Sequence, residues 1–238
     1  MKNQEEGLVR TVGVLGLSAN IINIIIGAGI FALPAIIAAN MGSSSIIAYV
    51  VCGFLLALIM LCFAEAGSKV TNTGGPYTYI ETAFGDYAGF LGGVFAMGSA
   101  LLSDAAVSNA LVNVLASSYP IFANDMVRLV FLFVVFFGLA TINVIGIKQG
   151  IGLVKFFVVA KLIPLLMLIL FGWTAVTSSN LSIEAMPSIE LVGKTSLILF
   201  FAFVGGESGL IVGGEVKNPN RTIPRGIFIG ITTVVVIY

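Results

Sequence analysis

The chain has 238 residues, of which 58% are hydrophobic and only 9% are charged, and its mean hydropathy is +1.11. Because a soluble globular domain is typically about 25% charged, this composition predicts an integral membrane protein. The formal net charge is zero, which gives no reason to expect a nucleic-acid partner. With no histidine, and with two cysteines inside one apolar run, we expect neither a metal site nor a cofactor.

Segments of about 20 mostly apolar residues are long enough to cross a bilayer. Six such segments and the start of a seventh follow a polar N-terminal segment, residues 1–13, and they cover 14–39, 44–67, 87–118, 127–146, 151–175, 194–215 and 227 onward. At about 1.5 Å per residue, the last segment would rise only about 20 Å before the sequence stops. We therefore expect the chain to be a fragment of a longer protein.

Lysine and arginine in the loops predict which way the chain crosses the membrane. With the N-terminus inside, eight basic residues fall on the inner side and two, Arg128 and Lys194, fall on the outer side. We expect a multi-pass protein of the cell membrane with a cytoplasmic N-terminus. The first inner loop contains a stretch that we expect to form a short amphipathic helix from Pro76 to near Gly85.

Glycines interrupt two of the expected spans close to the middle of the bilayer. Gly27 and Gly29 lie about 13 residues into the first span, and Gly205 and Gly206 lie about 11 residues into the sixth, which runs in the opposite direction. Two such breaks indicate an inverted repeat with a substrate site between them, because unwound backbone is tolerated in lipid only where protein or ligand satisfies it. Close packing of helices is the alternative for either pair alone.

Three blocks of sequence carry a resemblance to a known family: IIGAGIFALP, FAEAGSKVTNTGGPYTYIETAFG and FFAFVGGESGLIVGGEVKNPNRTIPRGI. In this order they resemble the amino acid–polyamine–organocation transporters, and the chain is similar to the N-terminal half of a typical member. The resemblance implies an all-α integral membrane protein with a LeuT-type fold of two five-helix inverted repeats. It implies six complete transmembrane helices and the start of a seventh, with helices 1 and 6 broken. The first repeat would occupy 14–175, and the second would begin within 194–238.

The resemblance also implies how the two breaks would bind a substrate. Backbone N–H groups of the first break would hold a carboxylate, and carbonyls of the second would accept an ammonium group. The implied residues are Gly27, Ala28, Gly29 and Ile30 in the first break, and Phe201, Ala202, Phe203 and Gly205 in the second. Phe201 and Phe203 would be pocket walls or gates, and ordinary packing is the alternative for either ring.

Three ionisable residues lie well inside expected spans, where each costs about 2.5–3.5 kcal/mol on insertion scales. Glu207 directly follows the second break and is a candidate for proton coupling, or else a structural acid bonded to freed backbone. Lys161 resembles a helix 5 lysine that lies near helix 1 in some proton-coupled relatives; snorkelling is its alternative. Asp104 would contact a cationic substrate side chain, or else would pair with Lys161 or with Ser103.

From these features we expect a secondary transporter of amino acids or related amines that works by alternating access. Proton-coupled symport is the first hypothesis, exchange of one amino acid or amine (a polyamine, for example) for another is the second, and an inactive fragment is the third. A membrane enzyme is disfavoured because the sequence has no catalytic constellation, and a channel would need more polar helix faces. The expected partners are a small-molecule substrate, protons and membrane lipid; homo-oligomers are compatible with the sequence.

Overall fold

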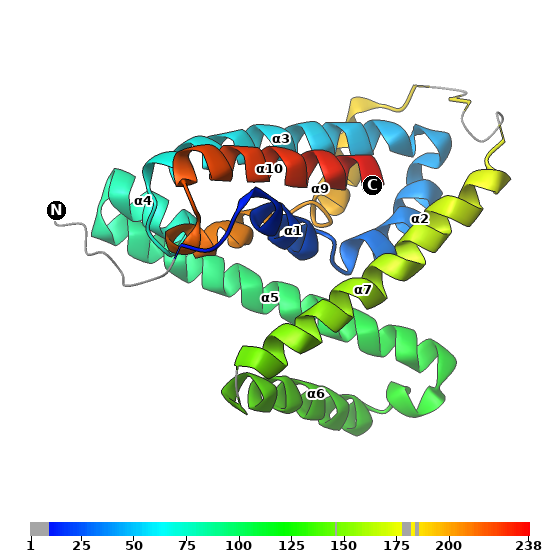
Figure 1. The fold of residues 1–238 in the computed structure, drawn as a ribbon. Helices are drawn as coiled ribbons and strands as arrows, with labels where there is room; N and C mark the ends of the chain where they lie inside the picture. The colour runs from blue at the N-terminus through cyan, green and yellow to red at the C-terminus, as the bar shows by residue number, and fades with distance from the viewer. Residues whose placement is uncertain (1–9, 146, 178–181, 184–185) are drawn as a thin grey trace. The chain divides into compact units, whose positions relative to one another are not determined.

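The computed structural model describes residues 10–145, 147–177, 182–183 and 186–238, and throughout these residues it is helical, with no β-strand (Figure 1). The α-helices are α1 (Val14–Ile25), α2 (Gly29–Met41), α3 (Ser45–Lys69), α4 (Pro76–Phe84), α5 (Asp86–Ser118), α6 (Asp125–Ile145), α7 (Ile147–Gly172), α9 (Ile189–Phe200) and α10 (Pro219–Ile237). Short 3₁₀ helices are η1 (Gly42–Ser44), η2 (Pro120–Ala123), η3 (Trp173–Ala175) and η4 (Gly206–Glu215). The expectation of an all-helical membrane protein is thus met.

The chain divides into two compact units. The first comprises Met1–Ala96 with Asn180–Tyr238, and the second comprises Met97–Ser179, so that α5 begins in one unit and ends in the other. In the first unit α10 packs against α1 and α3, and η4 packs against α1. Its core is aliphatic, with fully buried side chains such as Leu17, Ile21 and Ile227. The division of the chain into two sequence repeats remains a prediction.

Among the described residues, three helical stretches are long and apolar enough to cross a membrane: 29–69, 86–118 and 125–142. The first expected span is divided between two short helices, α1 and α2, and the sixth between α9 and η4, which agrees with the interruptions expected in these two spans. The last segment differs from its expected start at residue 227, because α10 already begins at Pro219. Proline suits the first turn of a helix, so the polar stretch that we expected to be a loop is the first two turns of α10.

The expected amphipathic helix of the first inner loop is confirmed as α4, which begins at Pro76. It is held to the unit by Tyr79, whose ring packs against Phe63 with a centroid distance of 6.3 Å. The Tyr79 hydroxyl lies over Gly67, where an added Cβ would be 2.7 Å from it. That hydroxyl is buried and has no hydrogen-bond partner among the described residues. Burial raises the pKa of Tyr79 to about 12, so the phenol stays neutral at physiological pH.

Replacing Tyr79 by phenylalanine is expected to stabilise the protein, because it removes a buried hydroxyl that lacks a partner. The free energy of unfolding should rise by about 1 kcal/mol, measured as a higher midpoint of thermal unfolding in detergent. Gly67→Ala should lower the midpoint, and the loss should be smaller in the Tyr79→Phe background because the oxygen nearest the new methyl group is gone. A lower midpoint for Tyr79→Phe alone would show that the hydroxyl has an essential partner.

Candidate functional site

The first helix break lies where the sequence places Gly27 and Ala28. Helix α1 closes with the Ile26 N–H donating to the Ile22 carbonyl at 2.9 Å, and α2 starts at Gly29. The N–H groups of residues 27–30 donate no hydrogen bond to any described residue, and no side chain caps α2. Because the N-terminus of a helix carries positive partial charge, these four N–H groups are suited to an anionic ligand.

The second break follows α9. The chain turns through residues 201–205 and continues as η4, and Gly205 adopts a φ of +118°, which favours glycine. Its N–H donates to the Glu207 carboxylate at 3.1 Å. The carbonyls of Phe201, Phe203 and Val204 accept no hydrogen bond from a described residue. Free carbonyl oxygens in a membrane segment are suited to a cation.

The two breaks touch through Gly29 and Ala202. A Cβ added to Gly29 would lie 2.7 Å from the Ala202 Cα and 2.8 Å from its Cβ, so the contact exists only because residue 29 has no side chain. The glycines that follow the second break pack in the same way, since an added Cβ at Gly206 would be 2.9 Å from the Ile25 side chain. The free N–H groups of one break and the free carbonyls of the other are therefore carried by backbone segments in direct contact.

Tyr238 joins the two breaks through its side chain. Its hydroxyl is 3.1 Å from the carbonyl of Ile25, the last residue of α1, and 3.0 Å from the carbonyl of Ala202. The single hydroxyl proton is shared between the two oxygens. The Tyr238 ring also packs edge-on against Phe203 at a centroid distance of 4.9 Å, and Tyr49 packs on Phe203 at 6.3 Å.

Comparison with known protein families matches residues 12–238 to a family described as amino acid permease. The chain belongs to the amino acid permease family. This agrees with the expectation drawn from the three sequence blocks.

Several curated members of the permease family are similar to the chain. The serine/threonine exchanger SteT of Bacillus subtilis (strain 168) is 31% identical, over 100% of this chain and 55% of that protein. The b(0,+)-type amino acid transporter 1 of Mus musculus is 30% identical over 97% of this chain and 50% of its own. The large neutral amino acids transporter small subunit 2 of Homo sapiens is 28% identical over 97% and 46%. The chain thus spans about half the length of the curated relatives it matches, and these relatives are transporters rather than enzymes.

Most of the residues that the sequence analysis predicts to bind substrate lie in the two breaks. Ala202 and Phe203 are buried, Gly29 and Ile30 are buried, and Ala28 is exposed. Phe201 is 46% exposed and makes none of the ring contacts that hold Phe203. Of the two predicted gate residues, then, Phe203 is part of the packed aromatic cluster and Phe201 is not.

Two predicted residues belong to the second compact unit. Asp104 is exposed on α5, and Lys161 is half-buried on α7. Both residues therefore lie in the second unit, whereas both breaks lie in the first. Contact of Asp104 with a substrate, and of Lys161 with the first break, remain predictions.

Sequence reasoning missed the residues that support the breaks from α1 and α10. Asn20 donates to the carbonyl of Gly209 at 3.2 Å, which ties α1 to η4. Tyr238 bridges the breaks themselves. The sequence feature that could have identified such residues is a polar side chain in an apolar helix, because a polar group in lipid needs a hydrogen-bond partner. Asn20 carries that signal within the first span, but the partner of Tyr238 could not be found from the sequence.

A short backbone pairing also ties the start of the chain to the end of η4. The N–H groups of Thr11 and Val12 both donate to the Glu215 carbonyl at 2.9 Å, and the Lys217 N–H donates to the Val12 carbonyl at 2.9 Å. These bonds form an isolated parallel bridge between Val12 and Val216. The bridge fixes α1 to η4 at the end away from the two breaks.

Proposed function

We propose that the chain forms the substrate-binding half of a secondary transporter of amino acids that works by alternating access. The observation that carries the proposal is the contact between the two breaks at Gly29 and Ala202. It brings N–H groups of residues 27–30 and carbonyls of residues 201, 203 and 204, none of which is hydrogen-bonded to a described residue, onto touching segments. An α-amino acid has one carboxylate and one ammonium group on the same carbon, so a single small zwitterion satisfies both sets.

The Ala202 carbonyl is a less suitable ammonium acceptor than the sequence alone implied. It already accepts a hydrogen bond from the Tyr238 hydroxyl. In this proposal the ammonium group binds the neighbouring carbonyls of Phe201, Phe203 and Val204, and Tyr238 holds the two breaks at a fixed separation. Phe203 stiffens the second break through its contacts with Tyr49 and Tyr238.

Exchange of one amino acid for another is the coupling mode that the observations favour over proton symport. One relative, SteT, is by name a serine/threonine exchanger. The Glu207 carboxylate makes a hydrogen bond within its own turn: it accepts the N–H of Gly205 and so caps the left-handed turn. That bond gives Glu207 a structural role that needs no proton transfer.

Counterflow in proteoliposomes tests the proposal and separates the two modes. The chain as its gene encodes it is reconstituted, and uptake of labelled serine and threonine is followed with and without unlabelled amino acid inside. Exchange predicts uptake that needs internal amino acid and ignores an imposed pH gradient. Uptake that is driven by the pH gradient into empty vesicles would support symport, and uptake of no amino acid in either format would overturn the proposed function.

The 238 residues taken alone are proposed to be inactive, because they span about half of each relative. The test expresses residues 1–238 and compares amino acid uptake with that of membranes that lack the polypeptide. Uptake above the level of those control membranes would refute this part of the proposal. Uptake at background level is the expected result.

Substitution of Glu207 distinguishes a structural acid from a proton carrier. Glutamine keeps an oxygen that can accept the Gly205 N–H, whereas alanine leaves that N–H without its partner, a loss of about 1–3 kcal/mol. We expect Glu207→Gln to retain exchange within about threefold and Glu207→Ala to lose about tenfold or more. Loss of exchange in Glu207→Gln equal to that in Glu207→Ala would show that the ionisable group itself is required.

A further inference from the structure

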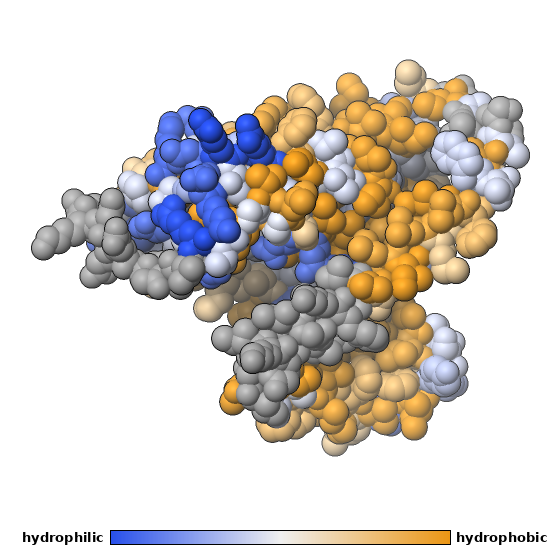
Figure 2. Space-filling view, viewed as in Figure 1, coloured by the Kyte–Doolittle hydropathy of each residue, from blue (hydrophilic) through white to orange (hydrophobic). Residues whose placement is uncertain are grey.

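A groove runs along the surface of the first unit between α3 and α10, beside the start of α1. It encloses about 550 Å³, and nearly all of its lining side chains are apolar. Figure 2 shows apolar side chains over α3 and α10, and hydrophilic side chains gathered where α10 begins. We call this feature the α3–α10 groove; its lining includes Val14, Ala57, Leu61, Arg225, Phe228 and Thr232.

One end of the α3–α10 groove is positively charged. Arg225 lines the groove, and Arg221 lies one helical turn earlier on the same face of α10. Arg221 lines a second cavity of about 510 Å³ together with Arg10 and Asn218. All three arginines are exposed.

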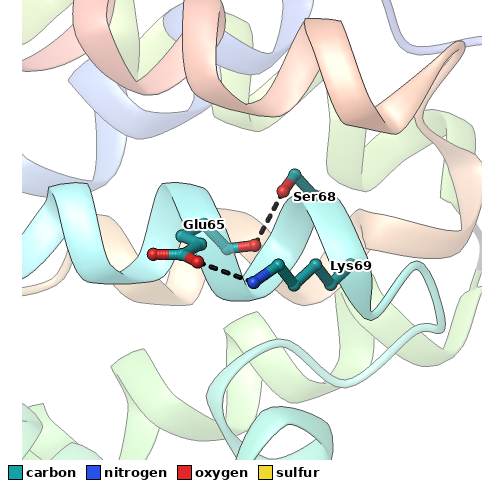
Figure 3. Close-up of polar contacts among 3 residues, drawn as sticks. All are labelled: Glu65, Ser68 and Lys69. Atoms are coloured by element: carbon teal, nitrogen blue, oxygen red, sulfur yellow. Dashed lines mark hydrogen bonds and ion pairs between the residues drawn. The ribbon is translucent and has the colours of Figure 1, made fainter.

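Within the part of the chain that the structure describes, these arginines differ from the neighbouring lysine in having no acidic partner. At the end of α3, Lys69 pairs with Glu65 at 2.6 Å, while the Ser68 hydroxyl donates to the Glu65 carbonyl (Figure 3). No described carboxylate lies within ion-pair distance of Arg10, Arg221 or Arg225. Among the described residues, the end of the groove therefore carries positive charge without a paired carboxylate, next to an apolar channel.

We propose that the α3–α10 groove binds an anionic phospholipid, with its phosphate on Arg225 and Arg221 and an acyl chain along the groove toward Thr232. The guanidinium group suits this ligand because it offers two parallel N–H donors to a phosphate. From Pro224 to Thr232 the helix rises about 12 Å, which is long enough to align the upper part of one acyl chain. The groove lies on an element of the expected inner side, where anionic lipids attract basic residues.

The headgroup, and not the tail, is what makes the proposed site selective. An acyl chain leaves one apolar environment for another when it enters the groove, so its transfer is the same for phospholipids with the same acyl chains and does not select among them. Each arginine near anionic lipid is expected to raise affinity about fivefold, and this gain should weaken as salt screens the charges. The groove nevertheless fixes where a lipid lies, so that only a molecule with both parts fits.

The test measures how many lipids the protein retains. The chain as its gene encodes it is purified, mixed with dioleoyl phosphatidylglycerol or dioleoyl phosphatidylcholine, and examined by native mass spectrometry. We expect about tenfold or greater preference for phosphatidylglycerol, and a loss of that preference in Arg221→Gln/Arg225→Gln. Arg128→Gln, in the second unit, removes the same charge and should leave the preference intact. Equal retention of both lipids by the unmodified protein would overturn the proposal.

Two further measurements distinguish a phospholipid bound in the groove from other ligands. Ala57→Phe places a large side chain in the groove and keeps both arginines, and it should reduce retention of phosphatidylglycerol about as much as the double variant. Glycerol 3-phosphate at millimolar concentration should fail to displace the lipid. Full displacement by glycerol 3-phosphate, or unchanged retention in Ala57→Phe, would show that the arginines bind phosphate alone or that another segment covers the groove. The outcome is independent of whether the protein transports amino acids.

Discussion

Gly29→Ala is expected to abolish amino acid uptake and to lower the stability of the protein. The new Cβ would lie 2.7 Å from the Cα of Ala202 and 2.8 Å from its Cβ, and backbone atoms cannot rotate away as a flexible side chain can. The two breaks would have to separate, at a cost of about 1–3 kcal/mol for an overpacked contact. Uptake in proteoliposomes and the midpoint of thermal unfolding in detergent measure the two effects.

Gly27→Ala is the matched control, because it adds the same methyl group two residues earlier. Its Cβ would meet only the carbonyl oxygens of Ile25 and Ile24, at 3.8 and 3.9 Å. The unfolding midpoint should therefore stay at the unmodified value. If Gly29→Ala and Gly27→Ala had the same midpoint, the contact between the breaks would not be a packing constraint and the proposed site geometry would be wrong.

Tyr238→Phe is the second substitution with a large expected effect. It keeps the ring that packs on Phe203 but removes the proton shared by the carbonyls of Ile25 and Ala202. Two carbonyls then lack a donor in a low-dielectric region, which costs about 1–3 kcal/mol. Because the breaks lose their common tether, we expect the half-saturation concentration for the amino acid to rise about tenfold, more than the maximal rate falls.

Tyr49→Phe controls for the loss of a hydroxyl from the same aromatic cluster. Tyr49 also packs on Phe203, but its hydroxyl makes no hydrogen bond to a described residue. The half-saturation concentration of the Tyr49→Phe variant for the amino acid should be unchanged. A tenfold rise in both variants would assign the effect to the aromatic cluster as a whole, and no rise in either would remove Tyr238 from the site.

Much of the helical architecture follows from composition and from the position of glycine. Apolar length predicts where α3, α5 and α6 lie to within about two residues at each end. Gly27 predicts the end of α1 to within two residues, whereas α9 already ends at Phe200, five residues before Gly205. The predicted start of α10 was wrong by eight residues. A polar stretch that contains prolines is typical of a loop, and nothing in its composition indicates that the helix begins within it.

The contacts that define the site could not be predicted from the sequence. That Gly29 touches Ala202, and that Tyr238 reaches both breaks, depend on how α1, α9 and α10 pack, and residues 29 and 202 are far apart in the chain. Periodicity gives no information about such pairs. The roles of Asp104 and Lys161 depend on the second compact unit and stay predictions.

Recognition of the two ends of an amino acid is the central claim, and competition against labelled serine tests it most directly. The competitors are unlabelled serine, serine methyl ester, which lacks the carboxylate, and N-acetylserine, which lacks the ammonium group. Binding between the N–H groups of residues 27–30 and the carbonyls of residues 201, 203 and 204 predicts that only serine competes, with each analogue weaker by about a hundredfold. Equal competition by either analogue would contradict the site.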